Sequence, residues 1–403
     1  MTIHERIARD ADQPAGILPA GIDPLIAGEI DQFVALRHDL HRHPEQAFRE
    51  RRTAQVVAAR LTDWGYEVTT GLGGTGVVAT LRRGAGDKRL AIRADIDALP
   101  IREATGKPYA SENDGVMHAC GHDGHTTILL AAAYRLAKST VLTGTLHLIF
   151  QPAEEIGAGA KKLISEGLFE RFPVDAIFGL HNWPSVPAGH FGFIEGPAMA
   201  AIDQAEVRIE GRGGHGAAPH EAVDPVLAAA HVITALQSIV ARNVDPLETG
   251  VVTVGAIHGG SAANVIPSAV DLKITTRSFR PEIRSLLEAR VPALIRAQAE
   301  SFGATARVDY RLGFPPVIND VEKTRFVRSV AIEAFGEDRV IADFRPRTAS
   351  EDFSFYLDEV PGSFLFVGNG DGPPLHSPEY DFNDAIIAPA ASLWVHLAER
   401  FLS

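Results

Sequence analysis

The succession of apolar strands and helices in the first half of the chain is the feature that most constrains its fold. Residues 77–81, 90–94, 145–150 and 176–180 are short apolar runs with strand character, and helical patterns separate several of them. Apolar strands that alternate with helices predict a mostly parallel sheet flanked by helices. Ligands of such α/β sheets bind beyond the carboxyl ends of the strands. The residues that follow each strand are therefore the first candidates for chemistry.

Acids and imidazoles follow these strands. In chain order they are Asp95 and Asp97, Glu154 and Glu155, His181 and, at some distance from a late strand at 364–367, His376. One such residue could follow a strand by chance, but a pattern repeated at four strands is much harder to explain in that way. We expect these side chains to meet at one edge of the sheet.

Residues 116–125 contain the only cysteine of the chain, three of its sixteen histidines and an aspartate. Cys120 and His122 stand two residues apart, a spacing that predicts an extended or loop segment in which both side chains lie on one side. A thiolate and an imidazole suit zinc, manganese, nickel or cobalt better than calcium or magnesium. The alternative is a buried apolar cysteine beside a core histidine, and for this pair alone it is the commoner case.

The adjacent carboxylates of Glu154 and Glu155 repel each other unless a cation lies between them or one is protonated. One could bind a metal while the other accepts a proton from an attacking water. The alternative is a solvated acidic loop. His181 and His376, taken singly, are equally compatible with structural roles. Asp97 is a candidate supporting acid that orients a ligand.

Residues 199–312 have a different hydrophobic pattern, because a predicted strand there alternates between apolar and charged residues. Their order is strand, helix, strand, strand, helix, strand, which predicts a ferredoxin-like α+β domain inserted into the first. The expected organisation is a flexible N-terminal extension at 1–23, a catalytic domain in two parts at 24–198 and 313–403, and the inserted domain at 199–312.

The formal charge of −13 and the lack of any basic run argue against nucleic-acid and membrane partners. A single cysteine cannot form an internal disulfide. Residues 1–23 show no signal-peptide pattern, and no uncharged apolar span of about 18 residues is evident. These features predict a cytoplasmic protein that acts on small molecules.

Several short motifs together closely resemble the M20 metallopeptidase family, and specifically its amidohydrolase branch of hippurate hydrolases, auxin-conjugate hydrolases and N-acyl-amino-acid deacetylases. The resemblance covers the chain from about residue 25 to its end. The motifs lie at residues 43–45, 93–100, 117–125, 150–155, 179–182, 213–215, 264–267, 350–353 and 375–378.

The resemblance implies two divalent metal ions, of manganese, zinc, nickel or cobalt, and Glu154 as the general base. The implied metal ligands are Cys120, His122, Glu155, His181 and His376. It also implies that the inserted domain forms a homodimer and holds substrate. His215 would stabilise the oxyanion, and Asn264 and Arg277 would bind the polar or carboxylate end of the substrate. Read from the residues alone, 213–216 is a hairpin turn and Arg277 a surface residue.

The function this implies is hydrolysis of the amide bond of N-acyl amino acids or related small amides by a metal-activated water. The alternatives are a carbamoyl-amide hydrolase of the same superfamily and a non-catalytic metal-dependent binding protein. The sequence departs from the wider family at Asp95, where relatives carry a ligand histidine, and at Ile156, where they tend to carry glycine. Asp95 and Asp123 are therefore doubtful ligands, and His118 and His125 keep structural interpretations.

Overall fold

The computed structural model describes residues 18–403, so most of the predicted extension at 1–23 lies outside the described residues. The chain divides into two compact units. Unit 1 comprises the residues up to Gly196, Ile318–Arg345 and Phe355–Ser403. Unit 2 comprises Pro197–Val317 and Pro346–Ser354. The chain thus returns to unit 2 for the short segment 346–354, which the sequence did not predict.

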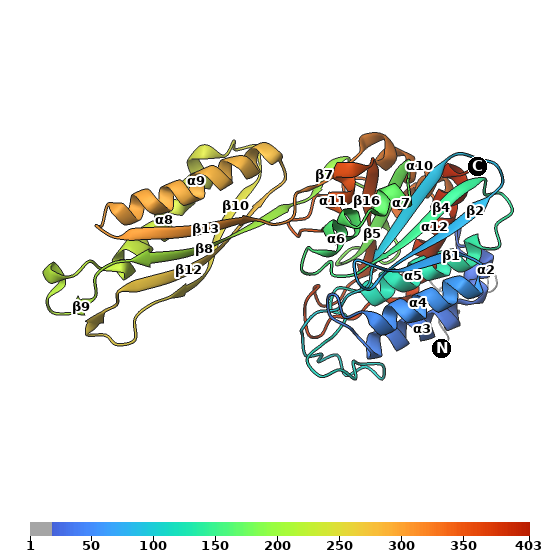
Figure 1. The fold of residues 1–403 in the computed structure, drawn as a ribbon. Coiled ribbons are helices and arrows are strands. Elements are labelled where there is room, and N and C mark those ends of the chain that lie inside the picture. Colours follow the sequence, from blue (N-terminus) through green and yellow to red (C-terminus); the bar gives the residue numbers. More distant parts are fainter. Residues whose placement is uncertain (1–17) are drawn as a thin grey trace. The chain divides into compact units, whose positions relative to one another are not determined.

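Unit 1 contains an eight-stranded sheet in the order β1-β2-β4-β3-β5-β16-β6-β15 (Figure 1). Its central strand β3 runs parallel to β4 and β5, and β5 runs parallel to β16. The carboxyl ends of these four strands therefore lie at one edge of the sheet, as predicted. The bounds are β1 Glu67–Leu72, β2 Gly76–Arg83, β3 Arg89–Asp95, β4 Gly144–Gln151, β5 Ala176–Pro184, β6 Phe191–Gly192, β15 Val340–Ile341 and β16 Gly362–Gly370.

The four parallel strands are buried along almost their whole length, which requires cover on both faces. The mostly parallel sheet flanked by helices is thus confirmed. Helix α5 packs on β3, α10 on β16, and α6 on β4. The helices of unit 1 are α2 Pro24–Gly28, α3 Ile30–Arg42, α4 Arg51–Asp63, α5 His122–Leu136, α6 Gly159–Ser165, α7 Leu168–Arg171, α10 Val321–Phe335, α11 Ser354–Glu359 and α12 Ile387–Phe401.

Local signals explain where several helices begin. The carboxylate of Asp23 accepts two backbone N–H groups of the first turn of α2, and that of Asp320 accepts the N–H of Lys323 in α10. The sequence predicts a helix over 127–137, whereas the observed helix α5 begins at His122, five residues earlier. Gly121 precedes it with φ 90, a left-handed conformation that favours glycine. Cys120 therefore lies in the loop and His122 in the first helical turn.

Unit 2 has a four-stranded antiparallel sheet in the order β10-β12-β8-β13, with α8 and α9 packed against it (Figure 1). This order of the strands confirms the ferredoxin-like arrangement. Burial alternates along β8, as expected for a strand with one exposed face. The bounds are β8 Ala201–Glu210, α8 Pro225–Asn243, β10 Gly250–His258, β12 Ala269–Ser278, α9 Pro281–Glu300 and β13 Thr305–Leu312, with a small pair of strands, β9 Gly214–His215 and β11 Val265–Ile266.

Within the described residues, α8 is the one helix whose length and composition would allow it to cross a membrane, whereas the sequence predicted no such span. The helix contains no aspartate, glutamate, lysine or arginine before Arg242. Ala228, Val232 and Leu236 on this helix are fully buried in the hydrophobic core of unit 2. The apolar character of α8 is therefore explained in part by packing within its own unit.

Candidate metal centre

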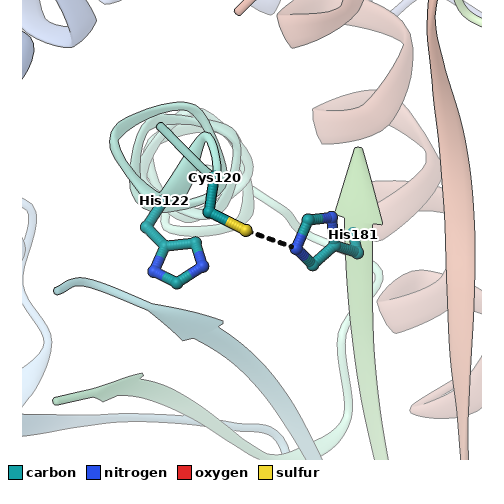
Figure 2. A group of neighbouring side chains, drawn as sticks. All are labelled: Cys120, His122 and His181. Atoms are coloured by element: carbon teal, nitrogen blue, oxygen red, sulfur yellow. Dashed lines mark hydrogen bonds between the residues drawn. The ribbon is translucent and has the colours of Figure 1, made fainter. Parts of the chain in front are cut away.

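Five side chains from distant parts of unit 1 converge beyond the carboxyl ends of the parallel strands. Cys120, His122 and His181 form one group in which a donor atom of each lies within 4.8 Å of the others (Figure 2). Cys120, Glu155 and His376 form a second such group. The thiol of Cys120 is common to both. The structure thus brings together all five residues that the sequence singled out as metal ligands.

The hydrogen bonds of two histidines fix the proton on the ring nitrogen that faces away from the group. His122 donates through Nδ1 to the carbonyl of Asp97 at 2.9 Å, and His181 donates through Nδ1 to the carbonyl of Asn182 at 2.6 Å. In the neutral form of each ring, Nε2 then carries the lone pair. His181 Nε2 lies 3.3 Å from the Cys120 sulfur. A fixed Nδ1–H with a free Nε2 is the usual state of a metal-binding histidine.

Two buried donor atoms of the group have no hydrogen-bond partner. They are Nε2 of His122 and Oε1 of Glu155, which lie 3.8 Å apart. The other carboxylate oxygen of Glu155 lies 3.5 Å from Nε2 of His376. Burying polar atoms without partners is costly, and a divalent cation bound between them would remove that cost. The donor set therefore fits a metal site.

The electrostatics of Cys120 support the same conclusion. Burial raises the pKa of its thiol, and the nearby charges of Glu155, Glu154 and Asp95 raise the pKa further. A thiolate is consequently unfavourable in this setting unless positive charge is added. Metal ions supply that charge and deprotonate a coordinating thiol.

Asp97 connects the two halves of the centre. Its carboxylate accepts the backbone N–H of Glu154 at 3.1 Å and that of Glu155 at 3.0 Å. Its backbone carbonyl accepts the hydrogen bond from His122. A single residue that lies two positions after the end of β3 therefore holds the loop with both glutamates against the helix that carries His122. This is the supporting position the sequence suggested for Asp97.

His376 lies in the loop after β16 and has φ 65, an unusual backbone conformation for a residue other than glycine. Its backbone N–H donates to the carbonyl of Ala119, next to Cys120. Backbone strain of this kind is frequent at functional sites. The sequence indicated His376 as a candidate but not the conformation that brings it to Glu155.

Asp95, which the resemblance places where relatives carry a ligand histidine, is hydrogen-bonded to residues outside the five proposed ligands, and one of its carboxylate oxygens lies 3.8 Å from Nε2 of His122. Its carboxylate accepts a hydrogen bond from Arg93 at 2.7 Å and one from His125 Nδ1 at 2.6 Å. Nε2 of His125 in turn accepts the backbone N–H of Asn182. Both nitrogens of His125 are thus used, which agrees with a structural role. Asn182 and Tyr380 also belong to this network, and sequence reasoning gave neither of them a role.

The predicted substrate-binding residues lie in unit 2. His215 on β9 is exposed, and its Nδ1 accepts the N–H of Ala217. Asn264 lies beside it, because its carbonyl accepts the N–H of Gly216. Arg277 on β12 is half-buried and donates to the hydroxyl of Ser350 at 2.5 Å. Their roles remain predictions.

Comparison with known proteins identifies the family. Residues 91–400 match the sequence model of peptidase family M20/M25/M40. The chain belongs to this family. This M20 protein is 43% identical over 371 residues to the hippurate hydrolase of Campylobacter jejuni, with 92% of this chain and 97% of that protein covered. It is 41% identical over 372 residues to the N-acetyl-L-cysteine deacetylase of Bacillus subtilis, with 92% and 88% covered.

Among solved structures, the M20 protein is similar to the YXEP protein of Bacillus subtilis, which is described as a dinuclear metal-binding peptidase of the same family. The TM-score is 0.81 and the identity 33%, with 93% of this chain and 98% of that chain covered. The amidohydrolase branch predicted from the sequence motifs is therefore confirmed. As a member of this branch, the protein is a metal-dependent hydrolase of amide bonds.

Proposed function

We propose that the protein cleaves the amide bond of N-acyl amino acids, or of closely related small amides, with two divalent metal ions. The observation that carries the proposal is the convergence of five donors, two of them buried and without partners. Cys120, His122 and His181 would hold one ion, and Cys120, Glu155 and His376 the other. Bound metal would polarise the substrate carbonyl and lower the pKa of water. Manganese, zinc, cobalt and nickel all suit these donors.

Glu154 is the proposed general base. It is buried, and a donor atom of its side chain lies within 4.8 Å of donor atoms of His122 and Glu155. The hydrogen bond from its N–H to Asp97 fixes its backbone beside the metal ligands. From this position the carboxylate would accept the proton of the attacking water and then transfer it to the leaving nitrogen.

His215, Asn264 and Arg277 are proposed to bind substrate. Because Nδ1 of His215 accepts a hydrogen bond, its proton lies on Nε2, which leaves an exposed N–H donor suited to an oxyanion. The planar guanidinium of Arg277 suits the carboxylate of an amino acid. We propose that Asn264 holds the polar end of the substrate next to His215.

The substrate class follows from relatives that share most of the chain and are named as a hippurate hydrolase and an N-acetyl-L-cysteine deacetylase. Both names describe removal of an acyl group from the nitrogen of an amino acid. Ile156, directly after the glutamate pair, is 59% exposed and offers apolar surface beside the candidate centre. We propose that it contacts the acyl group.

Replacing Glu154 by glutamine tests the assignment of the base. Glutamine keeps the size of the side chain but cannot accept the proton, so turnover should fall at least ~10²-fold. Metal content should remain at the wild-type level, since Glu154 is not a proposed ligand. The matched variant Glu155→Gln should instead lose bound metal. Near-normal turnover in folded, metal-loaded Glu154→Gln would overturn the assignment.

We also propose that unit 2 mediates a homodimer and that the protein is cytoplasmic. Strand β10 lies at an edge of the sheet of unit 2, and Ile257 on it is exposed. Val226 and Leu227 on α8 are exposed as well. The one cysteine is unpaired, which suits a reducing compartment. Sedimentation equilibrium of the purified protein would test the dimer, and a monomeric mass would contradict it.

A further inference from the structure

A chain of buried polar groups runs behind the candidate metal centre. It begins at Arg93, passes through Asp95 and His125, and reaches Asn182. All four side chains are at most 2% exposed. None belongs to the five proposed ligands. A buried polar network in which each member has a partner makes the structure around it more rigid. The role of this network therefore depends on which residues it holds in place.

Asn182 is where this chain meets the ligands. Its side-chain nitrogen donates to the carbonyl of Cys120 at 2.7 Å and lies 3.0 Å from Nε2 of His125. Its side-chain oxygen accepts the hydroxyl of Tyr380 at 2.6 Å. Its backbone carbonyl accepts Nδ1–H of His181. One buried residue therefore contacts the segments that carry Cys120 and His181, the two side chains joined in Figure 2.

The close approach of Asn182 also explains the glycine next to Cys120. A side chain at Gly121 would place its Cβ 2.4 Å from the side-chain nitrogen of Asn182 and 2.7 Å from the hydroxyl of Tyr380. The loop between Cys120 and α5 is thus fitted to the amide of Asn182. The orientation of that amide is fixed by three neighbours, which are Cys120, His125 and Tyr380.

We infer that Asn182 is a positioning residue that holds the Cys120 thiol and the His181 imidazole at the spacing needed to bind one metal ion together. In this inference Asp95 does not coordinate metal. It anchors His125, which in turn orients Asn182. The inference rests on the proposed function in so far as Cys120 and His181 are taken to be metal ligands. It assigns Asp95 an indirect role in supporting the thiol.

The test is the metal affinity and cobalt spectrum of Asn182→Leu, which keeps much of the side-chain volume and removes both polar groups. We expect the dissociation constant for metal to rise ~10–100-fold, as is common when a hydrogen-bond partner of a ligand is lost. The absorption that arises from cobalt bound to the thiolate should shift in position or intensity. Both are measured without substrate, by chelator competition and by titration with cobalt.

Asn319→Leu is the matched control. Asn319 is another buried asparagine of unit 1, and its side chain bonds the backbone of Ile194 and Phe364, away from the donors. This variant should lose stability but keep the wild-type metal affinity and cobalt spectrum. Equal weakening of metal binding in both variants would overturn the inference, because general loosening would then explain the effect.

Tyr380→Phe is a milder variant in case Asn182→Leu does not fold. It removes only the hydroxyl that bonds the side-chain oxygen of Asn182. We expect a smaller weakening of metal binding in the same direction. Wild-type affinity and spectrum in a folded Asn182 variant, or in Tyr380→Phe, would overturn the inference. Failure of the wild-type protein to hydrolyse any N-acyl amino acid would count instead against the proposed function.

Discussion

His118, His122 and His125 lie close together in the sequence, but the hydrogen bonds of their ring nitrogens differ, and so do the roles that these residues can have. His122 donates through one nitrogen to a backbone carbonyl and leaves the other without a partner. His125 uses both nitrogens in hydrogen bonds. His118 is buried and has no hydrogen-bond partner on either nitrogen. The sequence favoured His122 by its spacing from Cys120, but the tautomers depend on Asp97 and Asn182, which are distant in sequence.

Cys120 offers a direct test at the residue scale. Replacing it by serine substitutes an alcohol that does not ionise near neutral pH for a thiol that becomes a thiolate on metal binding. We expect the affinity for zinc and cobalt to fall by at least ~10-fold. The thiolate-to-cobalt absorption should also disappear. Because the chain has one cysteine, no other thiol can contribute to that signal. Persistence of the absorption in Cys120→Ser would contradict the assignment.

At the scale of elements, the central strands and the two ferredoxin-like helices follow from hydrophobic periodicity. The sequence predicts a helix over 321–335, which are the observed bounds of α10, and it predicts β3, β4 and β5 within a few residues. The two-residue strands β6 and β15 are too short to leave a pattern. The sequence did not predict the early start of α5. The loop that carries Cys120 ends at Gly121, whose left-handed conformation lets the helix begin directly at His122. Such local geometry depends on neighbours that the sequence does not reveal.

Gly121 allows the start of α5 to be tested. Alanine there would adopt an unfavourable left-handed conformation and place its Cβ against Asn182. We expect Gly121→Ala to lose stability and to bind metal at least ~10-fold more weakly. Gly65→Ala is the control, since Gly65 has φ 86 but no atom within 4 Å of an added Cβ. It should lose about 1 kcal/mol of stability, the usual scale for a left-handed non-glycine residue, and keep its metal affinity. Equal metal affinity in the two variants would refute the account of this turn.

Strand β4 carries a histidine whose charge state affects stability. His147 is 2% exposed and accepts a hydrogen bond from, or donates one to, the hydroxyl of Thr80. Burial, together with the nearby charges of Arg82 and Arg89, lowers the pKa of His147 to about 4. The folded state therefore favours the neutral ring. Its contribution to stability is present above the ordinary value of 6.5 and is lost as the pH falls towards 4.

We predict that His147→Gln reduces the acid sensitivity of folding. A pKa lowered from 6.5 to about 4 corresponds to a loss of up to roughly 3 kcal/mol on acidification. Urea unfolding of the metal-free protein at neutral pH and at about pH 4.5 would measure the difference. The variant should lose less stability between these two values than the wild type. An identical loss in both proteins would show that His147 stays accessible to protons in the folded state.

At the scale of the whole molecule, the proposed catalytic residues and the proposed substrate-binding residues belong to different units. The five proposed ligands and Glu154 all belong to unit 1, whereas His215, Asn264 and Arg277 belong to unit 2. The change in strand pattern near residue 199 made the insertion visible in the sequence. The membership of residues 346–354 in unit 2 was not predictable, because it depends on contacts such as the backbone hydrogen bond between Arg347 and Ala198.

The central claim is that hydrolysis of N-acyl amino acids requires two metal ions at the convergent donors. It is tested by removing metal with a chelator and restoring manganese, zinc, cobalt or nickel in measured amounts. Turnover of acetyl, benzoyl and indole-acyl amino acids would be followed with metal content determined on the same sample. The account predicts no turnover without metal, and full activity with at least one of these metals at two bound ions per chain. Full turnover by the metal-free protein, or two bound ions with no hydrolysis of any of these substrates, would contradict it.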